Sequence, residues 1–145
     1  MKTIKQEVHF DVKPNEVYEA YVDAKKHGEI TDSKVVFENK VGGKFSAWDG
    51  GLSGENVELV EGKKIVQKWR SDDWPEGHYS DLMIELFPDP SPSVILSEAK
   101  NLNGTRLVLT QENVPDDKFR DINSGWHEYY WEPMKKYFKK GKKRQ

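Results

Sequence analysis

The sequence predicts an α+β fold in which a curved antiparallel sheet wraps around a long C-terminal helix, with two short helices after the first strand. Two observations predict it. Segments with alternating apolar residues, separated by turn sequences, recur between residues 35 and 111. The last segment carries aromatic residues at three- and four-residue steps, so it forms a helix with an apolar stripe. That stripe has to be buried, and a curved sheet is the only large partner the chain offers.

The composition fits one domain with a substantial core. A chain of 145 residues suits a single domain. Only 35% of the residues are apolar, but five Trp, six Tyr and six Phe offset this, because each aromatic side chain buries roughly 150–250 Å². The absence of cysteine excludes disulfides, thiolate metal sites and thiol nucleophiles. The N-terminal segment has no continuous apolar stretch, so we expect a cytoplasmic protein without a membrane partner.

The first elements are a strand and two short helices. Thr3–Asp11 alternates apolar and polar residues and predicts a strand. Pro14 suits the first turn of a helix. The apolar stripe of that helix consists of Val17, Tyr18, Tyr21 and Val22. Asp23–Thr31 is expected to continue as a second short helix or turn, with a break at Gly28.

The middle of the chain predicts a series of antiparallel strands. Asp49–Gly50–Gly51 is the strongest hairpin signal in the sequence. The expected strands are Val35–Glu38, Lys44–Trp48, Leu52–Val60, Lys63–Arg70, His78–Leu86 and Thr105–Gln111. Pro88–Asn103 interrupts the last hairpin, and its prolines argue against regular structure, except for a helical turn at Ser97–Leu102. We interpret Pro88–Asn103 as a loop insertion.

The last element is a long amphipathic helix. Pro115 precedes it and Asp116 is expected to cap its N-terminus. A kink is expected near Gly125 or Pro133. The aromatic and apolar stripe consists of Phe119, Ile122, Trp126, Tyr129, Tyr130, Met134, Tyr137 and Phe138.

The C-terminal end is strongly basic, although the whole chain has a formal charge of only −2. We interpret residues 140–145 as a basic tail that extends a helix end, where cations complement the helix dipole. The rest of the chain is acidic, which opposes a nucleic-acid partner.

Several motifs together resemble a known family. They are Phe45–Glu55, Ile65–Arg70, Trp74–Ser80, Thr105–Leu109, Asn113–Pro115 and Gly125–Trp131. The combination is similar to the domain shared by activators of the 90-kDa heat-shock-protein ATPase and their small bacterial and archaeal relatives. That domain belongs to the START-like (SRPBCC, birch-pollen-allergen-like) superfamily. The resemblance covers roughly residues 2–139, and we therefore assign residues 1–139 to a helix-grip domain that contains the insertion at residues 88–103.

The resemblance implies a hydrophobic cavity between the sheet and the C-terminal helix, and a role in binding. The candidate cavity residues are Trp69, Phe119, Trp126, Tyr129, Tyr130 and Met134. The candidates for a pocket mouth or a partner surface are Trp48, Arg70, Trp74 and His78. Core packing is the simpler explanation for the large aromatic residues. The favoured alternative for Arg70 and His78 is structural: Arg70 pairs with Asp72, Asp73 or Glu55, and His78 bonds the Asp73–Gly77 loop.

Three function classes stay open. A co-chaperone-like module would bind a 90-kDa heat-shock chaperone, and a carrier would hold a small apolar ligand in the cavity. A cavity enzyme is less expected, because no nucleophile elbow, phosphate-binding glycine loop or dinucleotide motif is present. The four histidines lack metal-ligand spacing. We therefore assign no catalytic residue, no metal and no cofactor.

Overall fold

The computed structural model describes residues 1–89 and 104–143 and confirms the α+β class. Seven strands form one antiparallel sheet in the order β1-β7-β6-β5-β4-β3-β2. They are β1 (Lys2–Phe10), β2 (Val35–Phe37), β3 (Lys44–Ala47), β4 (Leu52–Val60), β5 (Lys64–Ser71), β6 (Ser80–Asp89) and β7 (Gly104–Val114). The helices are α1 (Pro14–Val22), α2 (Ala24–Thr31), α3 (Phe119–Trp126) and α4 (Glu132–Lys143). A short 3-10 helix, Asp116–Lys118, precedes α3, and a π-helical segment, His127–Trp131, joins α3 to α4.

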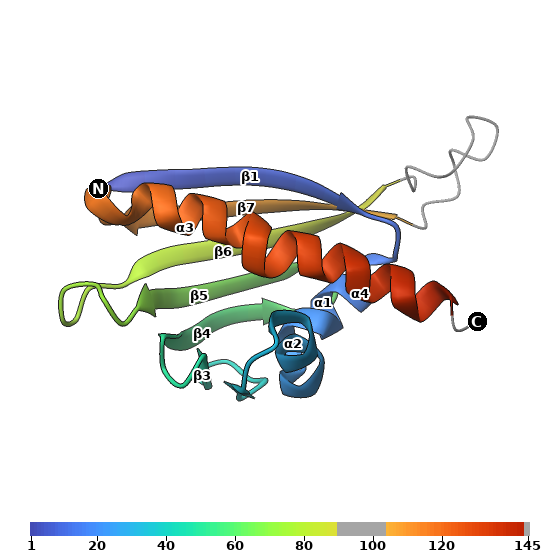
Figure 1. The fold of residues 1–145 in the computed structure, drawn as a ribbon, viewed down its shortest axis with the longest axis horizontal. Helices are drawn as coiled ribbons and strands as arrows, with labels where there is room; N and C mark the ends of the chain where they lie inside the picture. The colour runs from blue at the N-terminus through green and yellow to red at the C-terminus, as the bar shows by residue number, and fades with distance from the viewer. Residues whose placement is uncertain (90–103, 144–145) are drawn as a thin grey trace.

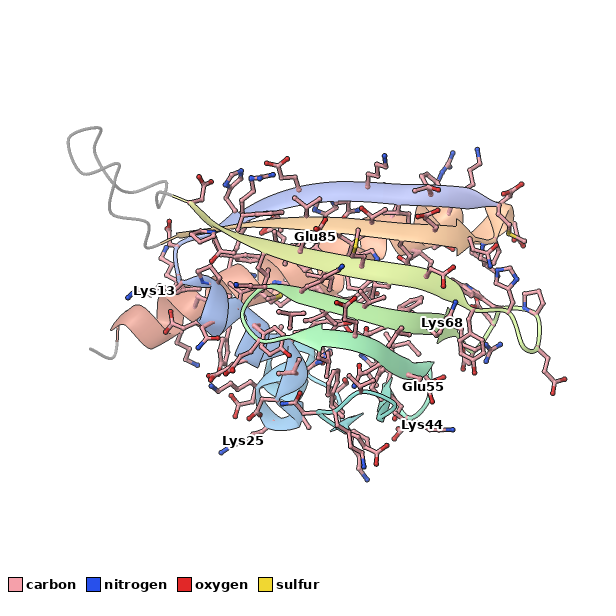
Figure 2. All side chains as sticks on the ribbon, turned by 180° about the vertical axis from the view of Figure 1, so that it is seen from behind. Lys13, Lys25, Lys44, Glu55, Lys68 and Glu85 are labelled. Carbon is pink, nitrogen blue, oxygen red and sulfur yellow. The ribbon has the colours of Figure 1, made fainter. Side chains whose placement is uncertain are left out.

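The C-terminal helix lies along one face of the sheet, with α1 and α2 beside α4 (Figure 1). The core fills the space between the helices and this inner face, because alternate strand residues point toward the helix. Its fully buried apolar side chains are Ile4, Val17, Ile65, Leu82, Ile84, Leu107, Leu109, Val114, Trp131 and Met134. The outer face carries polar side chains such as Lys68 and Glu85 (Figure 2). None of the described helices combines the length and the apolar character needed to cross a membrane.

Two expectations about helix ends and breaks are wrong. α2 continues through Gly28 without a break and ends at Thr31, followed by the C-cap Asp32, whose φ of 51° is left-handed. Asp116 does not cap α3, because Lys118 occupies the N-cap position and makes no side-chain cap. The Asp116 carboxylate instead lies 2.9 Å from the N-terminal ammonium group of Met1, which lowers the pKa of that carboxyl group.

The expected insertion begins later than the sequence suggested. Pro88 and Asp89 belong to β6 and pair with Thr105 and Gly104 of β7. A proline is tolerated there because the ladder to β5 ends at Glu85, so the missing N–H faces no neighbouring strand. Residues 90–103, including the expected helical turn at Ser97–Leu102, lie outside the described residues.

The long C-terminal helix contains its irregularity between the two positions expected for a kink. The π-helical segment separates Gly125 from Pro133, and the amide of Glu132 bonds the carbonyl of His127, five residues earlier. The wider turn aligns residues five apart, so the Trp126 and Trp131 rings stack at 5.3 Å with an interplanar angle of 15°. α4 continues to Lys143, so residues 140–143 of the expected basic tail are helical.

Candidate functional site

An open groove of about 250 Å³ lies between α3 and the adjoining ends of β3, β4 and β5. It is lined from the sheet side by Trp48, Gly51, Leu52, Trp69 and Ser71. It is lined from the helix side by Asp121, Ile122, Gly125, Trp126, Tyr129 and Tyr130. Four of the six predicted cavity residues, Trp69, Trp126, Tyr129 and Tyr130, therefore meet there, together with Trp48 from the predicted mouth.

Trp48 occupies an unusual backbone conformation at the rim of the groove. It begins the β3–β4 turn with a φ of 51°, and Asp49 follows at 53°. Gly50 continues at 88°, and the amide of Gly51 bonds the Trp48 carbonyl at 2.9 Å. A bulky residue with positive φ is a true outlier, and such strain persists where the surroundings hold it and is concentrated at functional sites. The turn thus places the indole over the groove at a cost in backbone energy.

The aromatic rings that line the groove are inclined steeply to one another. The Trp48 ring lies 5.7 Å from Tyr129 at 71° and 6.1 Å from Tyr130 at 81°. Trp126 lies 4.8 Å from Tyr130 at 47°, and Trp69 lies behind Trp126 at 5.8 Å. Tyr129 is 50% exposed, whereas Tyr130 is buried. Ring faces therefore approach the groove from several directions.

The ring of Tyr130 is held from behind by His27, a residue that the sequence analysis did not single out. The Tyr130 hydroxyl lies 2.9 Å from His27 Nε2, and His27 Nδ1 lies 2.8 Å from the Tyr21 carbonyl oxygen. The carbonyl only accepts, so Nδ1 carries the hydrogen and Nε2 accepts from Tyr130. Burial lowers the pKa of His27 to about 4 and raises the pKa of Tyr130 well above its usual value. Both groups are therefore neutral at pH 7.

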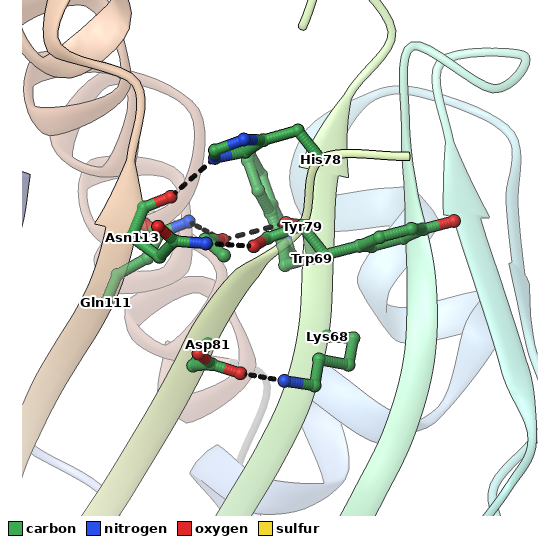
Figure 3. Close-up of polar contacts among 8 residues, drawn as sticks. Lys68, Trp69, His78, Tyr79, Asp81, Gln111 and Asn113 are labelled. Atoms are coloured by element: carbon green, nitrogen blue, oxygen red, sulfur yellow. Dashed lines mark hydrogen bonds and ion pairs between the residues drawn. The ribbon is translucent and has the colours of Figure 1, made fainter. Parts of the chain in front are cut away.

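A second polar chain fixes Trp126 and the sheet beneath it. Trp126 Nε1 donates to Gln111 Oε1 at 2.9 Å, and Gln111 Nε2 donates to Ser80 Oγ at 2.9 Å. Ser80 Oγ in turn donates to the Trp69 carbonyl at 2.8 Å (Figure 3). Trp69 Nε1 is buried and has no hydrogen-bond partner among the described residues. The floor of the groove is therefore tied to the sheet through Trp126 and the Trp69 carbonyl, whereas the Trp69 indole N–H makes no such bond to any described residue.

The other predicted mouth residues hold the β5–β6 loop and do not line the groove. Arg70 donates to the carbonyls of Trp74 at 2.9 Å, Pro75 at 3.3 Å and His78 at 3.3 Å. These bonds replace the expected acidic partners of Arg70, and Asp73 pairs instead with Lys118 at 3.0 Å.

His78 bonds the Asp73–Gly77 loop as expected, because its backbone amide donates to the Pro75 carbonyl at 3.0 Å, and its ring bonds the β7 strand. Its Nε2 lies 2.8 Å from the Asn113 carbonyl, and Asn113 Nδ2 donates to the Tyr79 carbonyl at 2.9 Å (Figure 3). Trp74 is only 4% exposed and packs against Trp69 and His78. Its ring therefore offers no partner surface, contrary to the sequence-based expectation.

The other two cavity candidates lie away from the groove. Met134 borders an interior void of only about 10 Å³, beneath the middle of the C-terminal helix. Phe119 is partly buried against the core, with the Lys2 ammonium group 5.9 Å from its ring centre. Side chains thus fill the space between the sheet and the middle of the helix, and the open volume lies at the α3 end.

A second depression lies on the outer face of the sheet. It has a volume of about 530 Å³ over β2 to β5, and Lys44, Glu55, Lys68 and Tyr79 are among its lining residues. Figure 2 shows the three charged side chains of this set projecting from that face. Lys68 pairs there with Asp81 (Figure 3). No group of three or more potential metal ligands occurs within residues 1–89 and 104–143.

Comparisons with known sequences point to one family. A model described as "Activator of Hsp90 ATPase homolog 1-like protein" matches residues 11–139. An activator of 90 kDa heat shock protein ATPase homolog from Dictyostelium discoideum is 34% identical over 125 residues, which are 86% of this chain and 30% of that protein. Homolog 2 from Mus musculus is 32% identical over 87% of this chain and 34% of that protein. The chain thus spans about a third of the length of these relatives.

Solved structures agree with the fold. The crystal structure of an HSP90 activator from Plasmodium falciparum matches with a TM-score of 0.77 and 28% identity, over 90% of this chain and 91% of that one. The solution structure of an Aha1 dimer from Colwellia psychrerythraea matches with a TM-score of 0.68 and 16% identity, over 89% and 90% of the two chains. At that identity, the second likeness speaks for the fold alone.

Proposed function

Since this chain belongs to the family of Activator of Hsp90 ATPase homolog 1-like proteins, we propose that it is a binding module for a 90-kDa heat-shock chaperone. The family membership carries the proposal. Its relatives are named as activators of the chaperone's ATPase, which favours a binding role over catalysis. Because the chain spans only about a third of those relatives, stimulation of the ATPase is a separate part of the proposal from binding itself.

The rim of the groove is the surface that we propose for the chaperone. Tyr129 is half exposed there beside the strained turn of Trp48 and Asp49. Exposed aromatic residues anchored in a rigid surround are typical of residues that dominate protein interfaces. The backbone strain at Trp48 supports the same choice, because strained backbone positions are concentrated at functional sites.

Two exposed tyrosines provide a matched test. The full chain and its variants would be mixed with a purified 90-kDa heat-shock chaperone, and both binding by calorimetry and ATPase rate would be measured. Tyr129→Ala removes a rim ring that is 50% exposed, and Tyr79→Ala removes an outer-face ring that is 40% exposed. We expect Tyr129→Ala to weaken binding at least about tenfold, the effect of one interface anchor, and Tyr79→Ala to change it little.

The outcomes separate the parts of this proposal. If the wild-type chain neither binds the chaperone nor changes its ATPase rate, the chaperone role is wrong. Binding without stimulation retains the module and removes the activator role. A larger loss for Tyr79→Ala would move the interface to the outer face of the sheet.

A second candidate function is the binding of a small ligand in the groove. The specific observation that favours it is the open volume of about 250 Å³ between Trp48, Trp69 and Trp126. Native mass spectrometry of the purified protein tests it, because a co-purifying compound would add a discrete mass that denaturation releases. Absence of that mass together with unchanged indole signals in a ligand screen would remove this candidate.

A further inference from the structure

We propose that the groove binds a small quaternary ammonium compound, with its cationic head among the aromatic rings and beside the Asp121 carboxylate. The inference rests on the second candidate function, because it names the chemical class of the ligand for that same groove. It does not depend on the chaperone interaction.

The walls of the groove suit a cation better than a plain apolar molecule. Five aromatic side chains line it, and among the described residues Leu52 and Ile122 are the only larger aliphatic side chains beside them. Aromatic faces attract cations through their quadrupole, and cages of such rings bind quaternary ammonium groups. Trp48 meets Tyr129 at 71° and Tyr130 at 81°, so the rings can enclose a compact head from more than one side.

The charged side chain that lines the groove is negative, which suits a cationic ligand. Asp121 contributes a carboxylate, and none of the described residues that line the groove is Lys, Arg or His. The Lys118 ammonium group pairs with Asp73 at 3.0 Å and is attracted more weakly by Asp121, and both carboxylates raise the pKa of Lys118. Behind the wall, His27 is neutral because its burial lowers its pKa to about 4. A bound cation therefore meets one negative charge at the lining and no positive charge within it.

The size of the groove favours a compact ligand. Its volume of about 250 Å³ is below the roughly 300–1,000 Å³ of pockets for drug-sized molecules. Asp121, Gly125 and Tyr129 follow one another at four-residue steps on the helix. Gly125 has no side chain, so the wall between Asp121 and Tyr129 is backbone alone, and a Cβ at Gly125 would lie 3.7 Å from the Tyr129 ring.

Choline and its neutral isostere 3,3-dimethyl-1-butanol provide the decisive comparison. The two share one shape and differ in the charge of the head group. Binding would be followed in the full chain by ¹H–¹⁵N spectra of the tryptophan indole groups, with Trp48, Trp69 and Trp126 assigned. We expect choline to shift these signals and to bind roughly 5- to 30-fold more tightly than the neutral alcohol, the range that cation–π attraction supplies.

Two pairs of variants locate the site. Gly125→Leu fills the space between Asp121 and Tyr129 with a better helix former, and we expect it to abolish the choline shifts. Asp121→Asn removes the lining charge, and Asp117→Asn makes the same change at an exposed position that does not line the groove. We expect Asp121→Asn to weaken choline binding about two- to fivefold, as suits an exposed charge, and Asp117→Asn to leave it unchanged.

Each failure has a distinct meaning. If both compounds bind equally well, the groove is a ligand site but the cationic class is wrong. If neither compound shifts the indole signals, the quaternary ammonium class is wrong, and the ligand-binding candidate then rests on native mass spectrometry alone. Equal losses for Asp121→Asn and Asp117→Asn would attribute choline binding to overall charge and overturn the site. Retained choline binding in Gly125→Leu would also overturn it.

Discussion

Trp126 of α3 and Gln111 of β7 are joined across the core by a hydrogen bond of 2.9 Å, from the indole Nε1 to the amide Oε1. Both side chains are buried. The same pattern recurs on β1 and β5, where Trp131 Nε1 donates to Gln6 Oε1 at 2.7 Å and Tyr21 donates to Gln67 Oε1 at 2.9 Å. Three glutamines on the inner face thus help to set where Trp126, Trp131 and Tyr21 lie, because each accepts the hydrogen bond of one of these rings.

Gln111→Leu should destabilise the domain without creating a large cavity. The replacement leaves the Trp126 indole N–H without its acceptor and removes the donor to Ser80. An unsatisfied buried polar group costs about 1–3 kcal/mol, so the urea midpoint should fall accordingly. Thr110→Val, on the adjacent outward-facing residue, is the control and should stay within about 0.5 kcal/mol. An unchanged midpoint for Gln111→Leu would show that the bond contributes nothing.

The stability of the domain should depend on pH through His27. Its folded pKa of about 4 lies below its ordinary value of 6.5. Between these values the unfolded chain binds a proton that the folded domain does not, so the free energy of unfolding falls as the pH falls. The loss amounts to about 3 kcal/mol by pH 4, and the contribution is constant above pH 6.5.

Urea unfolding at several pH values between 4 and 7 measures this dependence. His27→Gln should flatten the slope in that window, whereas the exposed His127→Gln should retain it. NMR titration of the His27 ring gives an independent reading. A folded-state pKa near 6.5 would contradict the prediction even if the variant failed to fold.

Replacement of Trp48 should separate backbone strain from ring contacts. Trp48→Gly and Trp48→Ala both remove the ring from Tyr129 and Tyr130. Only glycine adopts the φ of 51° without strain. Trp48→Gly should therefore be more stable than Trp48→Ala by about 1 kcal/mol, the cost of a left-handed conformation for an L-residue. Equal urea midpoints, or a more stable alanine variant, would show that the turn is not strained.

Two glycines should respond to alanine in opposite ways. A Cβ on Gly54 would collide with the Lys68 carbonyl and lie 2.7 Å from the Phe45 ring. A Cβ on Gly125 would meet only Tyr129, at an ordinary 3.7 Å. Gly54→Ala should cost more than about 2 kcal/mol, because β4 and β5 must separate. Gly125→Ala should stabilise the helix by about 0.5–1 kcal/mol. Thermal unfolding of the two variants checks both signs.

Periodicity predicted most of the fold because the inner-face residues of each strand are buried at alternate positions. Ile4, Val8 and Phe10 on β1 behave in this way. The same alternation places Gln67 on the inner face between Ile65 and Trp69. It does not reveal that Gln67 bonds Tyr21, because that partner lies 46 residues away and the meeting of two segments is a property of the packed core.

The candidate site was less predictable from the sequence, because it too depends on contacts between segments that are far apart in the chain. His27 lies in a short, mainly polar helix, and only packing brings it 2.9 Å from Tyr130. The π-helical segment was hidden, because aromatic residues at 126, 129, 130 and 131, followed by Met134, satisfy both a regular helix and a widened turn. Trp74 is buried in a loop whose Trp74, Pro75 and His78 carbonyls all accept hydrogen bonds from Arg70. A sequence pattern does not reveal those bonds.

The π-helical segment divides the long C-terminal helix into two halves that present their apolar side chains to different surroundings. The half before His127 presents Trp126 toward the groove, and the half after Trp131 presents Met134 and Phe138 to the core. The π turn holds one residue more than a regular α turn, so loss of a single residue between them would restore regular α-helical winding. Residues now aligned five apart would then align four apart, and both halves would present the same faces as before. The same loss within α4 would turn the residues that follow by about 100° and take Phe138 out of the core. The π-helical segment is thus the part of this helix that tolerates a change of length by one residue.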